Sequence, residues 1–293
     1  MDRSGAQRPL ATRLARLGAI AAALVVGGVV FARLVTLGEA ESVGSPVGPD
    51  EVVHLHGIGL NPADGRVYLA THTGLLRVNR DGGAVRLADR YQDTMGFTIT
   101  GPDEFIGSGH PDLREGLPSR LGLIRSDDAG QSWKSVSLSD EADLHALVAV
   151  KDGLYAADAT TQRLIRSKDG GRSWQTLADV DLIALAVAPD TRRLVGAAPD
   201  GTPLRSDDGG ESWTKADGPA LTAVTWDDDL GPVGAASDGT VYASKDGRAW
   251  SPVGELPGQD PVLTAVDGEL IAATDGAVIS RSSDGGRTWT TTP

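Results

Sequence analysis

The sequence predicts an all-β fold made of six similar sheets, and two observations support this. First, one short pattern recurs along the chain: "SDDAGQSW" begins at Ser126, "SKDGGRSW" at Ser167, "SDDGGESW" at Ser206, "SSDGGRTW" at Ser282 and a shortened "SKDGRAW" at Ser244. Second, the unit that ends near Asp179 divides into four short runs typical of strands, "LHALVAV", "GLYAADA", "RLIRS" and "SWQTLAD". A regular period of this length indicates a repeat architecture.

The spacing of the repeats sets the number of sheets. The recurring aspartates Asp128, Asp169, Asp208, Asp246 and Asp284 are 41, 39, 38 and 38 residues apart, and the copies close on Trp133, Trp174, Trp213, Trp250 and Trp289. A weaker copy, "NRDGGAV" around Asp81, supplies a sixth unit, and its distance from Asp128 implies an insertion between them. Six four-stranded units predict a six-bladed β-propeller over residues 52–293.

This pattern closely resembles the Asp-box, or BNR, repeat S-x-D-x-G-x-[ST]-W of sialidase-like β-propellers. The resemblance implies a structural turn in which the Asp accepts backbone N–H bonds, the Gly tolerates positive φ and the Trp packs between layers. The same turn occurs in binding propellers and in photosystem-assembly-type factors. It therefore implies a fold and leaves the activity open.

Composition excludes several classes of function. The formal charge of −13 makes the chain acidic, so a nucleic-acid partner is not expected. The 38 glycines suit many tight turns, and the lack of cysteine excludes disulfides, thiolate metal sites and a catalytic Cys.

The N-terminus predicts a membrane anchor. A basic segment, residues 1–16, precedes a largely apolar stretch over 17–37 that is close to the roughly 20 residues needed to cross a bilayer. The upstream arginines predict a cytoplasmic N-terminus, with the rest of the chain outside the cytoplasm as a single-pass membrane protein. A cleaved signal peptide is the alternative. Residues 38–51 are expected to form a flexible linker.

The histidines are predicted to gather at one end of the propeller. Aligning the first strands of the six units places His56, Met95, His145, Ile183, Thr222 and Leu263 at equivalent positions around the central channel. Antiparallel pairing puts the ends of the second strands at the same mouth, which adds His72, His110 and Asp158. His54 lies two residues before His56 and is expected to share its strand face. All five histidines and the one internal methionine thus converge on blades one to three.

Three interpretations of this cluster remain open. Imidazoles and a thioether predict a metal site formed by His54, His56, His72, Met95, His110 and His145, with copper favoured and zinc or nickel next. Alternatively, neutral imidazoles and Asp158 bind a polar organic ligand such as a glycan or peptide. In the third interpretation the histidines bond nearby backbone and pack the channel.

Catalysis is the alternative to a binding or assembly role. A sialidase needs an arginine triad, a tyrosine nucleophile with a glutamate partner and an acidic proton donor. The sequence places no arginine at the channel-lining positions and no recognisable tyrosine–glutamate pair, so no catalytic residue is assigned. The "H-x-H-G" and "ATHxG" stretches resemble those of bacterial envelope proteins classed as glycosyl hydrolases on fold, and a hydrolase using His110 and Asp112 stays a second hypothesis.

Overall fold

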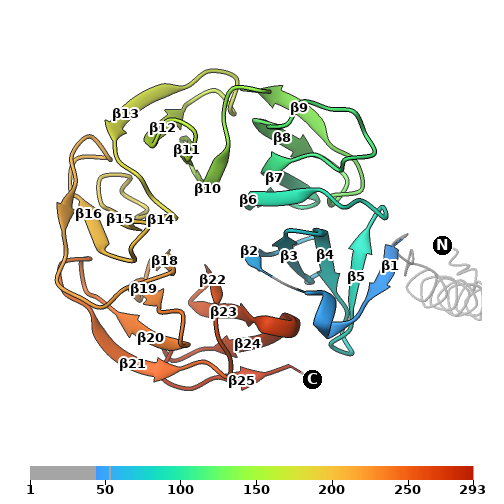
Figure 1. Ribbon diagram of the computed structural model, residues 1–293. Helices are drawn as coiled ribbons and strands as arrows, with labels where there is room; N and C mark the ends of the chain where they lie inside the picture. The colour runs from blue at the N-terminus through green and yellow to red at the C-terminus, as the bar shows by residue number, and fades with distance from the viewer. Residues whose placement is uncertain (1–43, 53, 293) are drawn as a thin grey trace, which may run out of the picture. The chain divides into compact units, whose positions relative to one another are not determined.

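Six sheets surround a central axis in the computed structural model, which describes residues 44–52 and 54–292 (Figure 1). The described residues form an all-β, six-bladed propeller, as the repeats predict, and contain strands and two 3-10 turns but no α-helix. No helix among them is long and apolar enough to span a membrane. The predicted basic segment 1–16 and anchor 17–37 lie outside the described residues.

Each blade is one continuous stretch of chain whose first strand is innermost (Figure 1). Blade 1 contains β2 (Leu55–Leu60), β3 (Val67–Thr71), β4 (Gly74–Val78) and β5 (Ala84–Leu87). Blade 2 contains β6 (Asp93–Gly101), β7 (Glu104–His110), β8 (Leu123–Ser126) and β9 (Lys134–Ser137). Blade 3 contains β10 (Leu144–Val150), β11 (Gly153–Asp158), β12 (Arg163–Ser167) and β13 (Gln175–Asp179). Blade 4 contains β14 (Ala184–Val187), β15 (Leu194–Ala197), β16 (Pro203–Ser206) and β17 (Thr214–Lys215). Blade 5 contains β18 (Ala223–Asp227), β19 (Gly231–Ala235), β20 (Thr240–Ala243) and β21 (Ser251–Glu255). Blade 6 contains β22 (Val262–Val266), β23 (Glu269–Thr274), β24 (Val278–Ser282) and β25 (Thr290–Thr291).

A fifth strand on blade 1 corrects the predicted linker. Residues 44–51 form β1 (Gly44–Val47), which pairs antiparallel with β5, and the turn η2 (Pro49–Glu51). Val47 is buried with residues of both blade 1 and blade 6, including Ile279 of β24. The "GSPV" run therefore has an apolar residue to bury and a free strand edge to pair with. The polar, Pro- and Gly-containing composition that suggested a tether did not reveal either.

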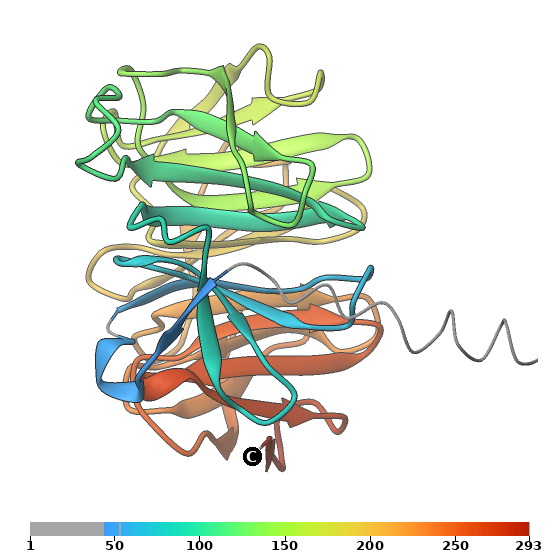
Figure 2. The same cartoon turned by 90° about the vertical axis from the view of Figure 1, so that its right-hand side faces the viewer.

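Strand register decides which residues share a face of the propeller. In blade 3, Leu144 at the start of β10 pairs with Asp158 at the end of β11, and Asp158 pairs with Arg163 at the start of β12. Ser167, where the Asp-box begins, pairs with Leu154 at the opposite end. The strands run between two faces (Figure 2). One face, which we call the mouth, carries the starts of the first strands, and the Asp-box turns lie at the other.

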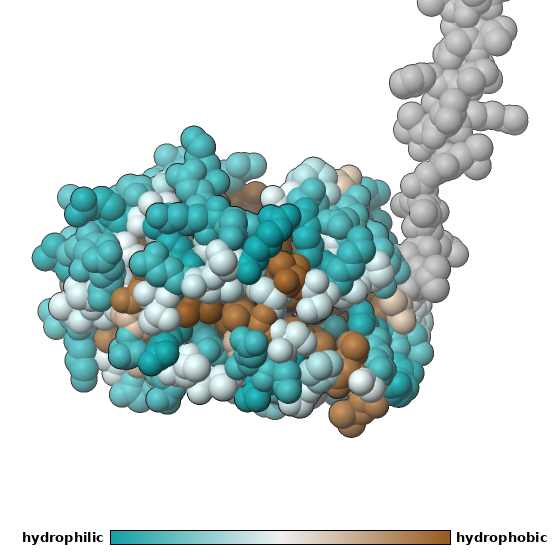
Figure 3. All heavy atoms as spheres, turned by 90° about the horizontal axis from the view of Figure 1, so that it is seen from above, coloured by the Kyte–Doolittle hydropathy of each residue, from teal (hydrophilic) through white to brown (hydrophobic). Residues whose placement is uncertain are grey.

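The Asp-box turns hold neighbouring blades together. In blade 3, Asp169 accepts hydrogen bonds from Ser167 Oγ, Ser173 N and Ser173 Oγ at 2.6–2.9 Å, and Trp174 Nε1 donates to Gly171 O at 3.1 Å. Gly171 has a φ of 86°, and a Cβ there would lie 2.0 Å from Leu123 of blade 2. The apolar cores lie between blades in the same way. In the edge-on view of Figure 3, apolar residues show as a broken band along the middle, and hydrophilic residues cover most of the surface around it.

Candidate functional site

Three β-bulges place the first side chains of the site. In β2 the register passes from Leu55↔Thr71 to Gly57↔Ala70, so His56 is an extra residue without a partner. Met95 in β6 and His145 in β10 occupy the same bulged position. A bulge interrupts the alternation of a strand and re-aims a side chain. All three side chains accordingly line one cavity at the mouth.

At the ring positions of blades 4 to 6, the cavity is lined by side chains that are not metal ligands or, for threonine, are poor ones. Ile183 and Thr222 lie just before β14 and β18 and line the mouth, as the alignment predicts. In blade 6 the prediction of Leu263 needs correction, because β22 pairs without a bulge and Val262 takes that place. The mouth cavity has a volume of about 280 Å³. His56 and His145 also line the channel cavity, of about 370 Å³, between the six first strands.

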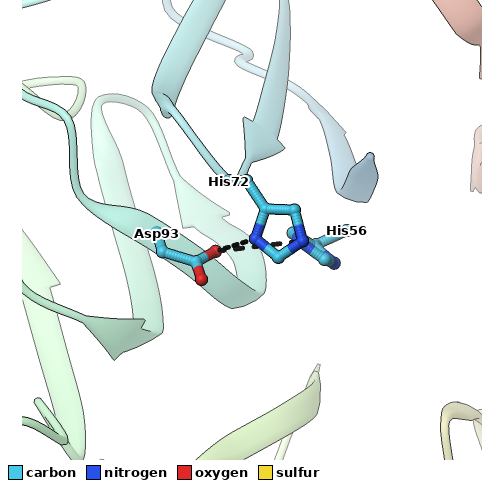
Figure 4. A group of neighbouring side chains, drawn as sticks. All are labelled: His56, His72 and Asp93. Carbon is cyan, nitrogen blue, oxygen red and sulfur yellow. Dashed lines mark hydrogen bonds and ion pairs between the residues drawn. The ribbon is translucent and has the colours of Figure 1, made fainter. Parts of the chain in front are cut away.

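His56, His72 and Asp93 form the tightest cluster of donor atoms (Figure 4). His72 follows β3, and its Nδ1 lies 2.8 Å from Oδ1 of Asp93, the first residue of β6. His56 Nε2 lies 3.7 Å from the same oxygen, and the rings of His56 and His72 meet edge to face at 4.4 Å. One ligand atom from each residue lies within 4.8 Å of the others, and no other group of three His, Cys, Asp or Glu in the described part of the chain meets that limit.

His56 is the buried member of this cluster. Its side chain is 16% exposed, and its Nε2 atom is buried without a hydrogen-bond partner within the described residues. Burial, and then the charge of His72, lowers the pKa of His56 to about 4. The ring is therefore neutral at physiological pH, as a metal-binding imidazole must be.

A second histidine pair shares another carboxylate. Asp143 Oδ2 lies 2.9 Å from His145 Nε2 and 3.5 Å from His110 Nε2. His110 Nδ1 lies 2.8 Å from Ser119 O, in the insertion after β7. The hydrogen bond to Asp143 raises the pKa of His145, and His145 in turn holds the pKa of Asp143 below its usual value against the effect of burial.

The remaining predicted residues lie at the mouth but in different roles. His54 precedes β2 with a φ of 54°, so it does not share a strand face with His56; its ring meets that of His72 at 5.2 Å. Asp158 accepts hydrogen bonds from Asp143 N, Thr160 N and Thr161 Oγ1, which occupy its carboxylate within the loop. Asp112 is buried, and its carboxylate accepts hydrogen bonds from the Arg114 guanidinium and from Tyr91 N. These two residues, rather than His110, are its partners.

The sequence reasoning missed the two carboxylates that organise the site. No role is assigned to Asp93 or Asp143 from the sequence. A signal was present: "DTM" and "DLH" both place an Asp two residues before the bulged position, at Met95 and His145. The bulge itself has no sequence signature here. Without it, the direction of the Asp side chain could not be predicted.

The structure gives no support to sialidase-type groups at the mouth. Within the described residues, neither the mouth cavity nor the channel cavity is lined by arginine, tyrosine or glutamate. Tyr68 donates to Asp64 at 3.0 Å, and Tyr155 is fully buried between blades 3 and 4.

Comparisons with known proteins show the fold. No protein-family profile matches the sequence. No curated protein sequence matches it either. Among solved structures, a putative gluconolactonase aligns with a TM-score of 0.63 and 16% identity over 83% of this chain and 93% of that chain. The GH74 enzyme of Niastella koreensis aligns with a TM-score of 0.58 and 15% identity over 85% of this chain but 46% of that chain. YCF48 bound to D1 peptide aligns with a TM-score of 0.50 and 17% identity over 85% and 84%. These similarities agree on a β-propeller and include hydrolase-like proteins.

Proposed function

We propose that this protein is a β-propeller binding module whose mouth holds a transition-metal ion between His56, His72 and Asp93. The observation that carries the proposal is the buried Nε2 of His56, which has no hydrogen-bond partner although it faces an imidazole and a carboxylate. A buried polar atom left unpaired costs about 1–3 kcal/mol. Coordination of a cation removes that cost and offsets the carboxylate charge.

The donor set indicates which ions fit. Two imidazoles and one carboxylate suit Zn²⁺ and Cu²⁺, and affinity at such sites generally rises toward Cu²⁺. His72 Nδ1 lies 2.8 Å from Asp93 Oδ1, so an ion held by both atoms would take the place of the hydrogen between them. Met95 of the next blade lines the same cavity as His56, and a thioether is a ligand that favours copper over zinc. Copper is therefore the first candidate and zinc the second.

Metal content of the purified chain tests this centre. Untagged full-length protein is stripped with a chelator, equilibrated with buffered Zn²⁺ or Cu²⁺, and its bound metal is measured by mass spectrometry. We expect His56→Leu and His72→Gln to lose the ion at this centre. The control Thr222→Ala, which alters the equivalent ring position in blade 5, should keep it. Retention of all metal by both histidine variants would contradict the proposal.

The cellular setting belongs to the same proposal. The apolar stretch 17–37 and the arginines before it support a single-pass anchor that displays the propeller outside the cytoplasm. A protein, peptide or glycan partner would then meet the mouth from the extracytoplasmic side; YCF48, one of the similar propellers, is seen with a bound peptide. Protease treatment of intact spheroplasts checks the orientation, because only an outward-facing propeller is cleaved.

Metal-assisted hydrolysis is the second candidate function. It is favoured by one observation, the cavity of about 280 Å³ that opens beside His56 and leaves room for a small substrate and a water molecule. The similar structures named as a GH74 enzyme and a putative gluconolactonase guide the choice of substrates. A panel of sugar lactones and fluorogenic glycosides, assayed with and without chelator, tests it. Turnover that disappears in His72→Gln would establish hydrolysis, whereas equal rates in wild type and variant would exclude this centre from it.

A further inference from the structure

The first centre has a counterpart one blade further around the propeller. His72 follows the second strand of blade 1 and meets Asp93, two residues before the bulged Met95 of blade 2. His110 ends the second strand of blade 2 and meets Asp143, two residues before the bulged His145 of blade 3. We propose that His110, Asp143 and His145 form a second metal-ion site, separate from the first.

The hydrogen bonds of His110 show what its second nitrogen needs. Ser119 O can only accept, so Nδ1 of His110 carries the hydrogen and donates to it. In the neutral ring, Nε2 then bears a lone pair. That lone pair faces Asp143 Oδ2 at 3.5 Å, and a carboxylate oxygen is also an acceptor. Two acceptors facing each other repel unless a cation lies between them.

Asp143 has further capacity that no described group uses. Its side chain is 14% exposed, and its Oδ1 is buried without a hydrogen-bond partner, while Oδ2 takes the contact from His145. Arg120 acts on Asp143 through its charge, but the described residues show no ion pair between the two. Oδ2 of Asp143 lies beside both imidazoles, and Oδ1 is a second, unpartnered acceptor of the same carboxylate. His110, His145 and Asp143 therefore offer two nitrogens and one carboxylate, the same donor types as in the first centre.

The two sites differ in tightness. Only the first has its three donor atoms all within 4.8 Å of one another. To bind an ion, the second must contract, and the proton that His145 Nε2 shares with Asp143 must leave. We expect the second ion to bind more weakly than the first and to be lost first during dialysis.

Zinc stoichiometry of the full-length protein tests the second site. Wild type, His110→Gln, His72→Gln and the double variant are equilibrated with buffered Zn²⁺, and bound zinc per chain is measured, with Thr222→Ala as control. We expect two equivalents in wild type and in the control, one in each single variant and none in the double variant. His145→Gln, which keeps an amide N–H to donate to Asp143, provides a second variant should His110→Gln fail to fold by circular dichroism.

The outcomes separate this inference from the proposed function. One equivalent in both wild type and His110→Gln would mean that only a proton occupies the second position, and would overturn the inference. Loss of all zinc in His110→Gln would also overturn it, because a single shared site would then use His110. Two equivalents in His72→Gln, with one in His110→Gln, would refute the first centre and leave the second standing.

Discussion

Replacing the bulged histidines of blades 1 and 3 by leucine should change stability in opposite directions. Both residues are histidines at the bulged position of a first strand, and both line the mouth cavity. They differ in their partners: His56 Nε2 has none, whereas His145 Nε2 bonds Asp143 at 2.9 Å. Leucine is similar in size and carries no polar atom, so each substitution removes only the imidazole's polar contacts to a first approximation.

The magnitudes follow from the cost of an unpaired buried group, about 1–3 kcal/mol. In metal-free protein, His56→Leu removes such a group and should raise the free energy of unfolding by about 1 kcal/mol. His145→Leu leaves Asp143, whose Oδ1 already has no partner, without its imidazole, and should lower the free energy by about 1–3 kcal/mol. At a metal concentration 100 times Kd, wild type gains about 2.7 kcal/mol per site, and His56→Leu gains nothing at the first centre.

Urea unfolding followed by tryptophan fluorescence measures these differences at several pH values. The folded-state pKa of His56, about 4, lies below its usual value of 6.5 because of burial. As pH falls from about 6.5 to 4, the unfolded chain binds a proton here that the folded chain does not, so wild type loses stability in that window. His56→Leu lacks this loss. A metal-free His56→Leu protein that is less stable than wild type at pH 7 would show that Nε2 has a partner, and would refute the reasoning behind the first centre.

Three further predictions concern the scaffold. Gly171→Ala should lower the free energy of unfolding by about 2–5 kcal/mol, because the strain of a left-handed φ adds to a clash with buried Leu123. Gly170→Ala should cost only about 1–2 kcal/mol, because its φ is also left-handed but its Cβ would make only an ordinary contact with Arg172 Nη1 at 3.5 Å. Equal losses in thermal melts would exclude the inter-blade contact. Acid should destabilise the Asp-box face, because hydrogen bonds from the serine hydroxyls and the backbone lower the pKa of Asp208 to about 2. The contribution of Asp208 to the free energy of unfolding is therefore present above pH 4 and is lost as the pH falls toward 2. A melting temperature that does not change between pH 4 and pH 2 would contradict this. Val47→Asp should release β1 and increase proteolysis within residues 44–51, and an unchanged cleavage rate would mean that β1 does not stay docked.

The fold was predictable because its determinants are local. The Ser, Asp, Gly and Trp of the Asp-box in blade 3 bond within eight residues, and the boxes that begin at Ser206 and Ser282 repeat these bonds. The pattern can therefore be recognised in the sequence without knowledge of tertiary contacts. Close packing between blades also limits the residue that follows the bulge in β6. A Cβ on Gly96 would lie 2.2 Å from Leu144 O of the next blade, so close packing around the channel demands a small side chain there.

The site was only partly predictable because it depends on departures from regular pairing. Alternation along a strand places His56 at the mouth but gives no account of an extra residue, and the bulge determines what that residue faces. Asp93 and Asp143 acquire their importance from histidines of the preceding blade, about 20 to 35 residues away in sequence. β1 was missed for the same reason, since its partner β5 lies forty residues downstream.

The two faces of the propeller differ in the packing and pairing of their side chains. At the Asp-box face of blade 3, Asp169 and Trp174 are hydrogen-bonded within the turn, and Gly171 fits against the neighbouring blade with no space for a Cβ. At the mouth, blades 1 to 3 interrupt their ladders with bulges and leave polar atoms of His56 and Asp143 buried without partners. Local arrangements that cost stability persist where they serve a function, because the rest of the fold supports them. At the mouth, the histidines and the unpaired atoms of His56 and Asp143 lie on blades 1 to 3, whereas the ring positions of blades 4 to 6 hold Ile183, Thr222 and Val262. This uneven distribution favours a ligand site over random variation of a packed channel.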